Sequence, residues 1–261
     1  MSPARRLLLQ SLAVVVALAL AAGVLLTVLR ERPTTAAPVA QDRPGPVLLV
    51  PGYGGETRGL EVLAALLRRE GRDAVVVEPP GDGTGRLEDA ALALRAAADD
   101  ALAAGAPSVD VVGYSAGGVV ARVWAAEGGA VKARRVVTLG SPHHGTDVAA
   151  LGATFASGAC PSACQELVPG SRLLTRLNAG DETPDGPAWT SVWTTDDTVV
   201  TPPASARLEG ALEVAVQEVC PGRRIGHGGL PRDAAVQQIV VQALSASPGR
   251  PGAEVCAAPS S

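Results

Sequence analysis

The chain has 261 residues, with 22 basic and 26 acidic side chains and a formal net charge of −4. The basic residues are scattered and form no positive cluster of the kind that binds nucleic acid, so a nucleic-acid-binding function is excluded. The length from residue 46 to residue 245 suits one α/β domain with a sizeable hydrophobic core.

The N-terminus is strongly apolar. Arg5 and Arg6 precede the stretch Leu7–Leu29, which is long enough to span a bilayer. An uncleaved transmembrane signal anchor and a cleaved signal peptide both agree with residues 1–30, and both place the rest of the chain outside the cytoplasm. A twin-arginine export signal is the weaker alternative to a plain basic flank. Residues 31–45, rich in Pro, Ala and Thr, predict an extended linker.

Apolar runs and helical periodicities alternate along residues 46–245. The runs predict six strands: Val47–Val50, Ala74–Val77, Val109–Tyr114, Val136–Leu139, Trp189–Trp193 and Val214–Val219. Apolar residues at helical spacing predict four helices: Thr57–Arg69, Leu87–Ala104, Gly118–Ala126 and Ala234–Leu244. Continuous apolar strands that alternate with helices predict an α/β fold, a mostly parallel sheet of about six strands with helices on both faces. The segment Val148–Leu177 has the least regular pattern.

Residues 113–117 read Gly-Tyr-Ser-Ala-Gly and join the third predicted strand to a helix. A Gly-x-Ser-x-Gly sequence between a strand and a helix is typical of a nucleophile elbow, a tight turn that raises a serine hydroxyl above a parallel sheet. The motif alone is weak in a glycine-rich chain, so the strand and helix around it carry the interpretation. Ser115 is therefore the predicted nucleophile.

Three histidines are candidates for the base that activates this serine. After a nucleophile elbow the chain order is serine, acid, histidine. His227 follows the last predicted strand and has glycine on both sides, whereas His143 and His144 precede every suitable acid. His227 is therefore the predicted base. The other two are expected to shape the pocket floor, with metal ligation as the alternative.

The acid is expected after the fifth strand, where Asp196 and Asp197 are neighbours. The short apolar return through Val199 and Val200 favours Asp197, because the chain turns back toward the sheet directly after it. Asp196 then caps the turn or faces solvent, and it remains the alternative acid. The function of the acid is to hold the histidine tautomer and to stabilise the imidazolium.

Attack on a carbonyl forms an oxyanion, which requires preorganised backbone donors. In this architecture one donor is the residue after the nucleophile, Ala116. The other comes from the loop after the first strand, where Tyr53 is the candidate. Glycines at positions 52, 54 and 55 permit unusual dihedral angles in that loop. The alternative interpretation is a glycine-rich connection without a catalytic function.

The four cysteines agree with export to an oxidising compartment. The preferred pairing, one of three, joins Cys160 to Cys164 and Cys220 to Cys256. The second bridge would tie the C-terminal tail, residues 246–261, to the domain. A zinc site made of the four thiolates is the rival interpretation, although the spacing lacks paired C-x2-C motifs.

In this combination and order, the motifs resemble those of the small secreted bacterial lipases and esterases of the α/β-hydrolase superfamily, that is, class 2 lipases. The resemblance covers residues 46–244 and includes the loop 51–54, the elbow, the strand-end motif Gly-Ser-Pro-His-His-Gly-Thr at 140–146, and the turns around Asp197 and His227. Pro51 departs from the pattern, because many relatives have histidine there. The resemblance implies a largely open site with only a small cap and a triad of Ser115, Asp197 and His227.

The sequence thus predicts an extracytoplasmic serine carboxylic-ester hydrolase, a lipase or esterase that acts on a small-molecule ester or lipid through an acyl-serine intermediate. A thioesterase or acyltransferase with the same residues is one alternative, and a non-catalytic membrane-tethered binding module is another. Neither a cofactor nor a metal is expected. The protein is expected to be a monomer, either secreted or anchored to the cell membrane by one N-terminal span.

Overall fold

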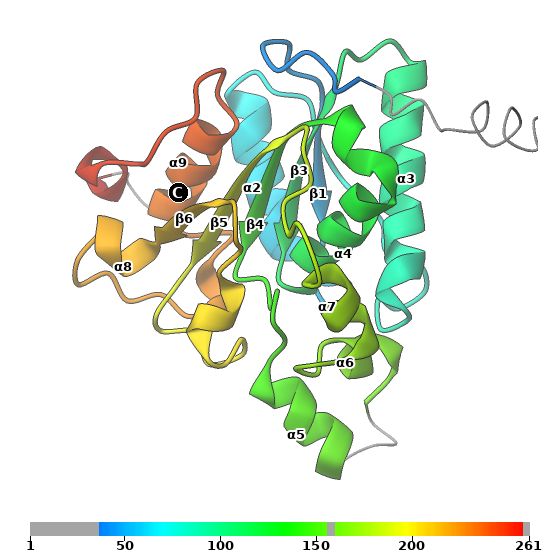
Figure 1. Cartoon of the computed structure of the whole chain (residues 1–261). Coiled ribbons are helices and arrows are strands. Elements are labelled where there is room, and N and C mark those ends of the chain that lie inside the picture. The colour runs from blue at the N-terminus through cyan, green and yellow to red at the C-terminus, as the bar shows by residue number, and fades with distance from the viewer. Residues whose placement is uncertain (1–36, 156–159, 258–261) are drawn as a thin grey trace, which may run out of the picture. The chain divides into compact units, whose positions relative to one another are not determined.

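The computed structural model describes residues 37–155 and 160–257 (Figure 1). Its centre is a six-stranded sheet in the order β2-β1-β3-β4-β5-β6, and all neighbouring strands are parallel. The strands are β1 (Val47–Val50), β2 (Ala74–Val76), β3 (Val109–Tyr114), β4 (Ala133–Leu139), β5 (Ala188–Trp193) and β6 (Leu212–Ala215). The predicted α/β fold with a parallel sheet is confirmed.

Helices connect these strands. Those that pack on the sheet are α2 (Arg58–Arg69), α3 (Leu87–Ala103), α4 (Ala116–Trp124) and α9 (Ala234–Ala243). Three further helices lie between β4 and β5: α5 (Asp147–Phe155), α6 (Ser162–Glu166) and α7 (Arg172–Leu177). The remaining helical turns are η1 (Ala125–Gly129), η2 (Ala130–Lys132), η4 (Pro203–Ala206), α8 (Val216–Val219), η5 (His227–Gly229) and η6 (Ala253–Ala257).

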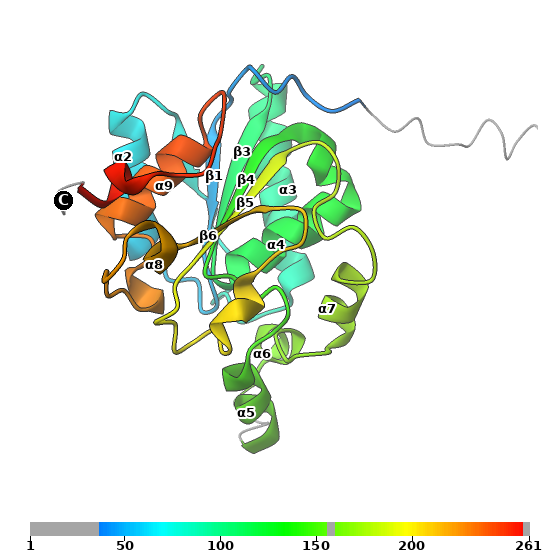
Figure 2. The ribbon, with the colours of Figure 1, turned by 60° about the vertical axis from the view of Figure 1, so that its left-hand side comes forward.

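The helices cover both faces of the sheet (Figure 2). On one face, α3 and α4 pack apolar side chains, Leu94 and Trp124 among them, against the strands. On the other face, α2 and α9 contribute side chains such as Leu63 and Ile239. Because the strands between these layers lose contact with water on both sides, they have continuous apolar sequences rather than alternating ones. The core therefore accounts for the runs that predicted the strands.

Asp110 interrupts the apolar run of β3 and is fully buried. Its carboxylate accepts hydrogen bonds of 2.6 Å from Arg72 and from Arg134, and Arg134 also donates to the Leu244 carbonyl at the end of α9. A buried charge is tolerated when ionic partners and hydrogen bonds replace its lost hydration. This polar group lies near the start of β3, at the opposite end of the strand from the Gly-x-Ser-x-Gly turn. It joins the sheet to α9 and contributes to the scaffold.

The sixth strand is shorter than predicted. Of the expected strand Val214–Val219, only the residues up to Ala215 belong to β6, and Val216–Val219 form α8. The physical reason lies in the neighbouring strand, because β5 ends at Trp193, whose partner is Ala215. Beyond that pair β5 offers no further backbone groups to hydrogen-bond, so the N–H and C=O groups of residues 216–219 form local, helical hydrogen bonds instead. A short apolar run does not by itself distinguish a strand from a helix.

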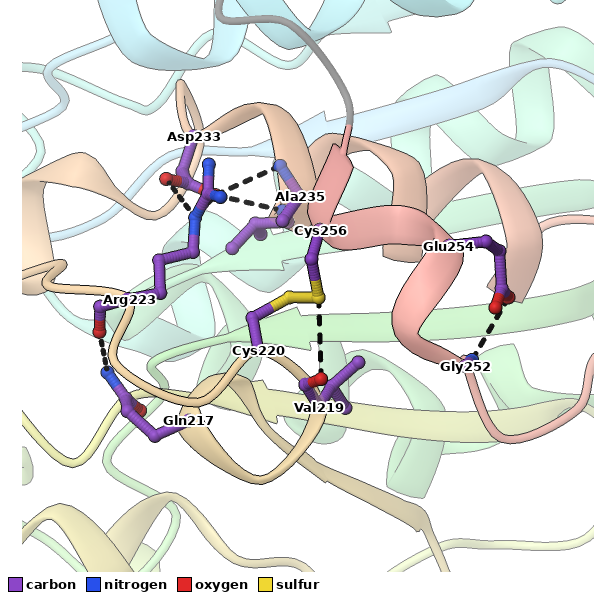
Figure 3. Close-up of a disulfide and its surroundings, with 10 residues drawn as sticks. Gln217, Val219, Cys220, Arg223, Asp233, Ala235, Gly252, Glu254 and Cys256 are labelled. Atoms are coloured by element: carbon purple, nitrogen blue, oxygen red, sulfur yellow. Dashed lines mark hydrogen bonds and ion pairs between the residues drawn. A yellow bond between two sulfur atoms is a disulfide. The ribbon is translucent and has the colours of Figure 1, made fainter.

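Two disulfides are present, Cys160–Cys164 and Cys220–Cys256, which is the pairing preferred from the sequence. The second joins the end of α8 to η6 in the C-terminal tail (Figure 3). In the same region Arg223 contacts both carboxylate oxygens of Asp233 at 2.8 Å. Asp233 also caps α9. The loop between residues 220 and 233 is therefore held at both ends.

The predicted membrane span or signal peptide, residues 1–30, lies outside the described residues. No helix in the described ranges is long and apolar enough to cross a membrane. The predicted linker overlaps the described chain only at residues 37–45. There the Val39 N–H donates to the Val131 carbonyl, and the Gln41 side chain accepts a hydrogen bond from Arg135. This part of the linker therefore lies against the domain.

Candidate active site

Ser115 lies in the sharp turn between β3 and α4. Its φ of 53° is positive, the one such value among non-glycine residues in the described part of the chain. A Cβ on Gly113 would lie 2.5 Å from the Gly118 Cα atom, and one on Gly117 would collide with the Val50 carbonyl oxygen. Only glycine fits at these two positions, because strand and helix pass so closely. The local backbone is thus a nucleophile elbow, with strain stored at the serine.

The Ser115 hydroxyl is 2.9 Å from His227 Nε2. The other ring nitrogen of His227, Nδ1, lies 2.7 Å from Asp197 Oδ2. The three residues come from the turn after β3, the turn after β5 and the η5 turn. Ser115 and Asp197 are separated by more than 80 residues along the chain. Asp197 and His227 are buried, with 6 % and 8 % of their surface exposed. The structure therefore brings together the serine, the acid and the histidine that the sequence singled out.

The two neighbouring aspartates have different partners. Asp197 uses one oxygen for His227, and its other oxygen accepts from the Val199 and Val200 N–H groups, each at 2.8 Å. The Asp196 carboxylate instead lies 3.3 Å from the Ile225 N–H and faces Arg224. The apolar return after Asp197 thus supplies the backbone donors that fix the orientation of its carboxylate.

Tyr114 packs against the histidine. The two ring centroids are 5.2 Å apart, and the Tyr114 hydroxyl donates a long hydrogen bond of 3.4 Å to the His227 carbonyl. Burial raises the pKa of Tyr114 to about 12, and the nearby carboxylate of Asp197 acts in the same direction. The hydroxyl therefore stays protonated at neutral pH. This contact supports the η5 turn and limits the orientations that the imidazole can adopt.

The two predicted oxyanion donors, Tyr53 and Ala116, belong to segments that adjoin Ser115. Ala116 is the first residue of α4, where backbone N–H groups have no acceptor within the helix. The loop that carries Tyr53 runs against the serine, since a Cβ on Gly52 would lie 3.0 Å from the Ser115 Cβ. Gly54 and Gly55 both have positive φ, as the tight course of this loop requires.

An apolar pocket of about 160 Å³ opens beside the serine. Its lining includes Tyr53, Ser115 and Val199, together with Leu167 and Cys164. Helices α5 and α6, from which part of this wall comes, extend from one end of the sheet (Figures 1 and 2). The three short helices α5 to α7 form the small cap that the resemblance implied. A site with a half-buried serine at the wall of an apolar pocket, together with a few directed polar groups, suits a small organic substrate.

The other two histidines are not among the described residues that line this pocket. His143 is fully buried, and its Nε2 atom lies 3.1 Å from the Thr138 hydroxyl. His144 is exposed at its ring and contacts Glu182 at 3.0 Å. Within residues 37–155 and 160–257, no group of three or more histidine, cysteine or acidic side chains is arranged to hold a metal ion.

Arg122 is a structural residue of the site that the sequence analysis did not identify. It is 1 % exposed on α4 and donates to the Leu177 carbonyl and to the Asn178 side chain, each at 2.9 Å, and to the Glu182 carbonyl at 3.2 Å. Burial lowers its pKa to about 10, so the guanidinium remains charged at neutral pH. Arg122 thus binds the end of α7 to the elbow helix. The one feature of the sequence that could have identified Arg122 is that it is the single charged residue within the apolar run 119–124.

We expect His143 to make stability depend on pH. Burial, with the nearby Arg122 charge, lowers the pKa of His143 well below 6.5. Between pH 6.5 and the lower pKa of the folded state, His143 is protonated in the unfolded chain but not in the native protein. The free energy of unfolding therefore falls as the pH decreases through this range. The limiting slope is about 1.4 kcal/mol per pH unit. Urea unfolding between pH 7.5 and 5 measures it. His143→Gln, which has no proton to gain, should flatten the slope; equal slopes in both proteins would contradict the assignment.

Comparisons with known proteins bear on the family and the fold. The family described as "Lipase (class 2)" matches residues 101–238, more than half of the chain. Among solved structures, the chain is similar to Bacillus licheniformis lipase BlEst2 in its mature form, with a TM-score of 0.57, 19 % identity, and coverage of 69 % of this chain and 86 % of that one. It is also similar to Aspergillus fumigatus lipase B, with a TM-score of 0.65, 17 % identity, and coverage of 83 % and 56 %. No curated protein matches the sequence.

The two structural likenesses support the fold, and the family match covers the segment from α3 to α9 that contains the elbow, the acid turn and the histidine loop. The resemblance noted in the motifs is confirmed by this match. The chain belongs to the class 2 lipase family.

Proposed function

We propose that this protein is an extracytoplasmic serine hydrolase of carboxylic esters that acts through an acyl-serine intermediate. The observation that carries the proposal is the continuous contact from the Ser115 hydroxyl to His227 and from His227 to Asp197, at 2.9 and 2.7 Å. Membership of the lipase family supports an ester or lipid as the substrate. The elbow backbone is consistent with a serine nucleophile, and the apolar pocket beside the serine is consistent with an ester or lipid substrate.

The proposed reaction has two halves. In the first, Ser115 Oγ attacks the ester carbonyl while His227 Nε2 takes the hydroxyl proton and then gives it to the leaving alcohol. Asp197 accepts the Nδ1–H and stabilises the imidazolium, while the N–H groups of Tyr53 and Ala116 stabilise the oxyanion. In the second half, water, activated by the same histidine, releases the carboxylic acid and restores the serine. Each oxyanion donor is worth about 3 kcal/mol in the transition state.

The two disulfides support an oxidising location outside the cytoplasm, because such bridges form and persist there. The apolar N-terminal segment supports export as well. Cleavage of this segment, or its retention as a membrane anchor, remains a prediction from the sequence, as does the monomeric state.

Active-site labelling tests the proposal directly. A fluorophosphonate probe should modify the folded protein at Ser115, because the probe forms a covalent bond only with an activated serine. The Ser115→Ala variant serves as the control and should stay unlabelled while it melts near the temperature of the wild type. A folded wild-type protein that resists the probe would overturn the proposal and favour the non-catalytic binding module. Parallel assays with p-nitrophenyl esters and acyl thioesters, with and without an alcohol acceptor, distinguish ester hydrolysis from thioesterase and acyltransferase activity.

A further inference from the structure

The pocket beside Ser115 offers almost no free polar group to a ligand. Three of its lining residues carry a hydroxyl, namely Ser115, which is the proposed nucleophile, Tyr53, which is 43 % exposed, and Thr146. The Thr146 hydroxyl already donates to the Val199 carbonyl at 2.6 Å and accepts from the Thr201 N–H at 3.1 Å. Cys164 is in a disulfide and has no thiol proton. A buried hydroxyl of a ligand without a partner would lose its hydration there without compensation. The pocket therefore suits a hydrocarbon chain rather than a glycerol or sugar moiety.

The lining residues divide into an exposed rim and a buried inner wall. Tyr53, Val148 and Val199 are 43 to 47 % exposed and surround the mouth. Leu167 and Ala149 are each 6 % exposed and lie on the inner wall. An alkyl group bound at Ser115 would therefore extend from the rim toward Leu167, at the end of α6.

This inner wall is fixed in place on several sides. The Leu167 carbonyl accepts from the Thr146 N–H at 3.0 Å, and the Ala163 N–H in α6 donates to the Thr84 carbonyl at 3.2 Å. The Cys160–Cys164 disulfide closes the start of α6, and a Cβ on Gly152 would lie 3.5 Å from the Cys164 sulfur, so α5 packs directly on the bridge. A wall held in this way gives the pocket a fixed depth.

We propose that this pocket receives the acyl chain of the substrate, and that Leu167, with Ala149 beside it, limits that chain to about six to eight carbons. The inference rests on the proposed function. A cavity of about 150 Å³ lined by aliphatic side chains holds a benzene molecule, that is, about six carbon atoms. The pocket has a volume of about 160 Å³, so a hexanoyl or octanoyl group fills it. Longer chains extend past the fixed wall only by displacing it.

Two substitutions with opposite effects on the pocket volume test the proposed limit on acyl-chain length. Leu167→Ala removes three carbons from the inner wall, and because the backbone on either side is anchored, the space should remain open. Each further methylene that becomes buried raises kcat/KM about fourfold. The ratio of kcat/KM for decanoate to that for hexanoate esters should therefore rise at least tenfold. Ala149→Leu fills the same space, and the ratio of hexanoate to butyrate should fall at least tenfold.

The controls are Leu173→Ala and Ala150→Leu. Leu173 is buried in α7, Ala150 is half-buried in α5, and neither lines the pocket. Both variants make the same chemical change in the same cap, so both should keep the wild-type preference. All five proteins are assayed with p-nitrophenyl esters from acetate to palmitate, and separately with acetate esters whose alcohol chain varies.

The outcomes separate this inference from the proposed function. If the fluorophosphonate labels Ser115 in every variant but the acyl preference stays unchanged, the limit assigned to Leu167 is wrong. If the substitutions alter the preference for the alcohol chain instead, the pocket holds the leaving group and the inference is also overturned. If Ser115 in the wild type is not labelled at all, the proposed function fails first. Should Leu167→Ala not fold, Ala149→Leu decides the question alone.

Discussion

Asp197→Asn is expected to lower kcat about 10,000-fold while the fold and the substrate affinity remain near those of the wild type. One Asp197 oxygen accepts two backbone N–H groups, from Val199 and Val200. An asparagine retains those bonds only with its carbonyl oxygen in the same place, which turns its NH2 group toward His227 Nδ1. The ring then carries its proton on Nε2 and cannot accept the proton of Ser115.

The neighbouring position provides the matched control. Asp196→Asn changes an adjacent aspartate in the same way, but its carboxylate contacts Ile225 and Arg224 rather than the histidine. This variant should retain activity within a few-fold of the wild type. Steady-state kinetics on one ester, together with circular dichroism and thermal melting, measure both effects. Near-normal turnover of Asp197→Asn with strong loss in Asp196→Asn would transfer the function of the acid to Asp196.

Removal of the Cys220–Cys256 disulfide is expected to cost about 4 kcal/mol of unfolding free energy, and removal of Cys160–Cys164 about 2 kcal/mol. The difference follows from the chain enclosed, since the bridges span sequence separations of 36 and 4 residues. A longer loop loses more freedom in the unfolded chain when it is closed. The long bridge also holds the tail, whose Val255 is buried against the face covered by α2 and α9.

Urea unfolding of the two double serine variants, Cys220→Ser/Cys256→Ser and Cys160→Ser/Cys164→Ser, measures both costs. The first should also unfold with a larger dependence on urea, because its unfolded chain is less compact. Equal losses in the two variants, or a larger loss for the short loop, would contradict this account and assign the stability to local packing instead.

Much of the fold was predictable because the main signals are local. A parallel sheet covered on both faces requires apolar strands, and Val47–Val50 and Val109–Tyr114 begin and end where their sequences indicated. The elbow was predictable for the same reason, since the glycines at 113 and 117 are needed by the turn itself. The predicted sixth strand extended too far toward its C-terminal end. Its true end is set by the end of its neighbour β5, and the sequence of residues 214–219 contains no information about that neighbour.

The candidate site divides in a similar way. The sequence by itself determined the fold class, the family and a short set of candidates, because residue type, spacing and chain order carry that information. Only the tertiary structure decided which of two adjacent aspartates contacts His227, that Arg122 joins the cap to α4, and how deep the pocket beside Ser115 is. These features depend on contacts between segments many residues apart, and their geometry is fixed by packing that no local pattern records.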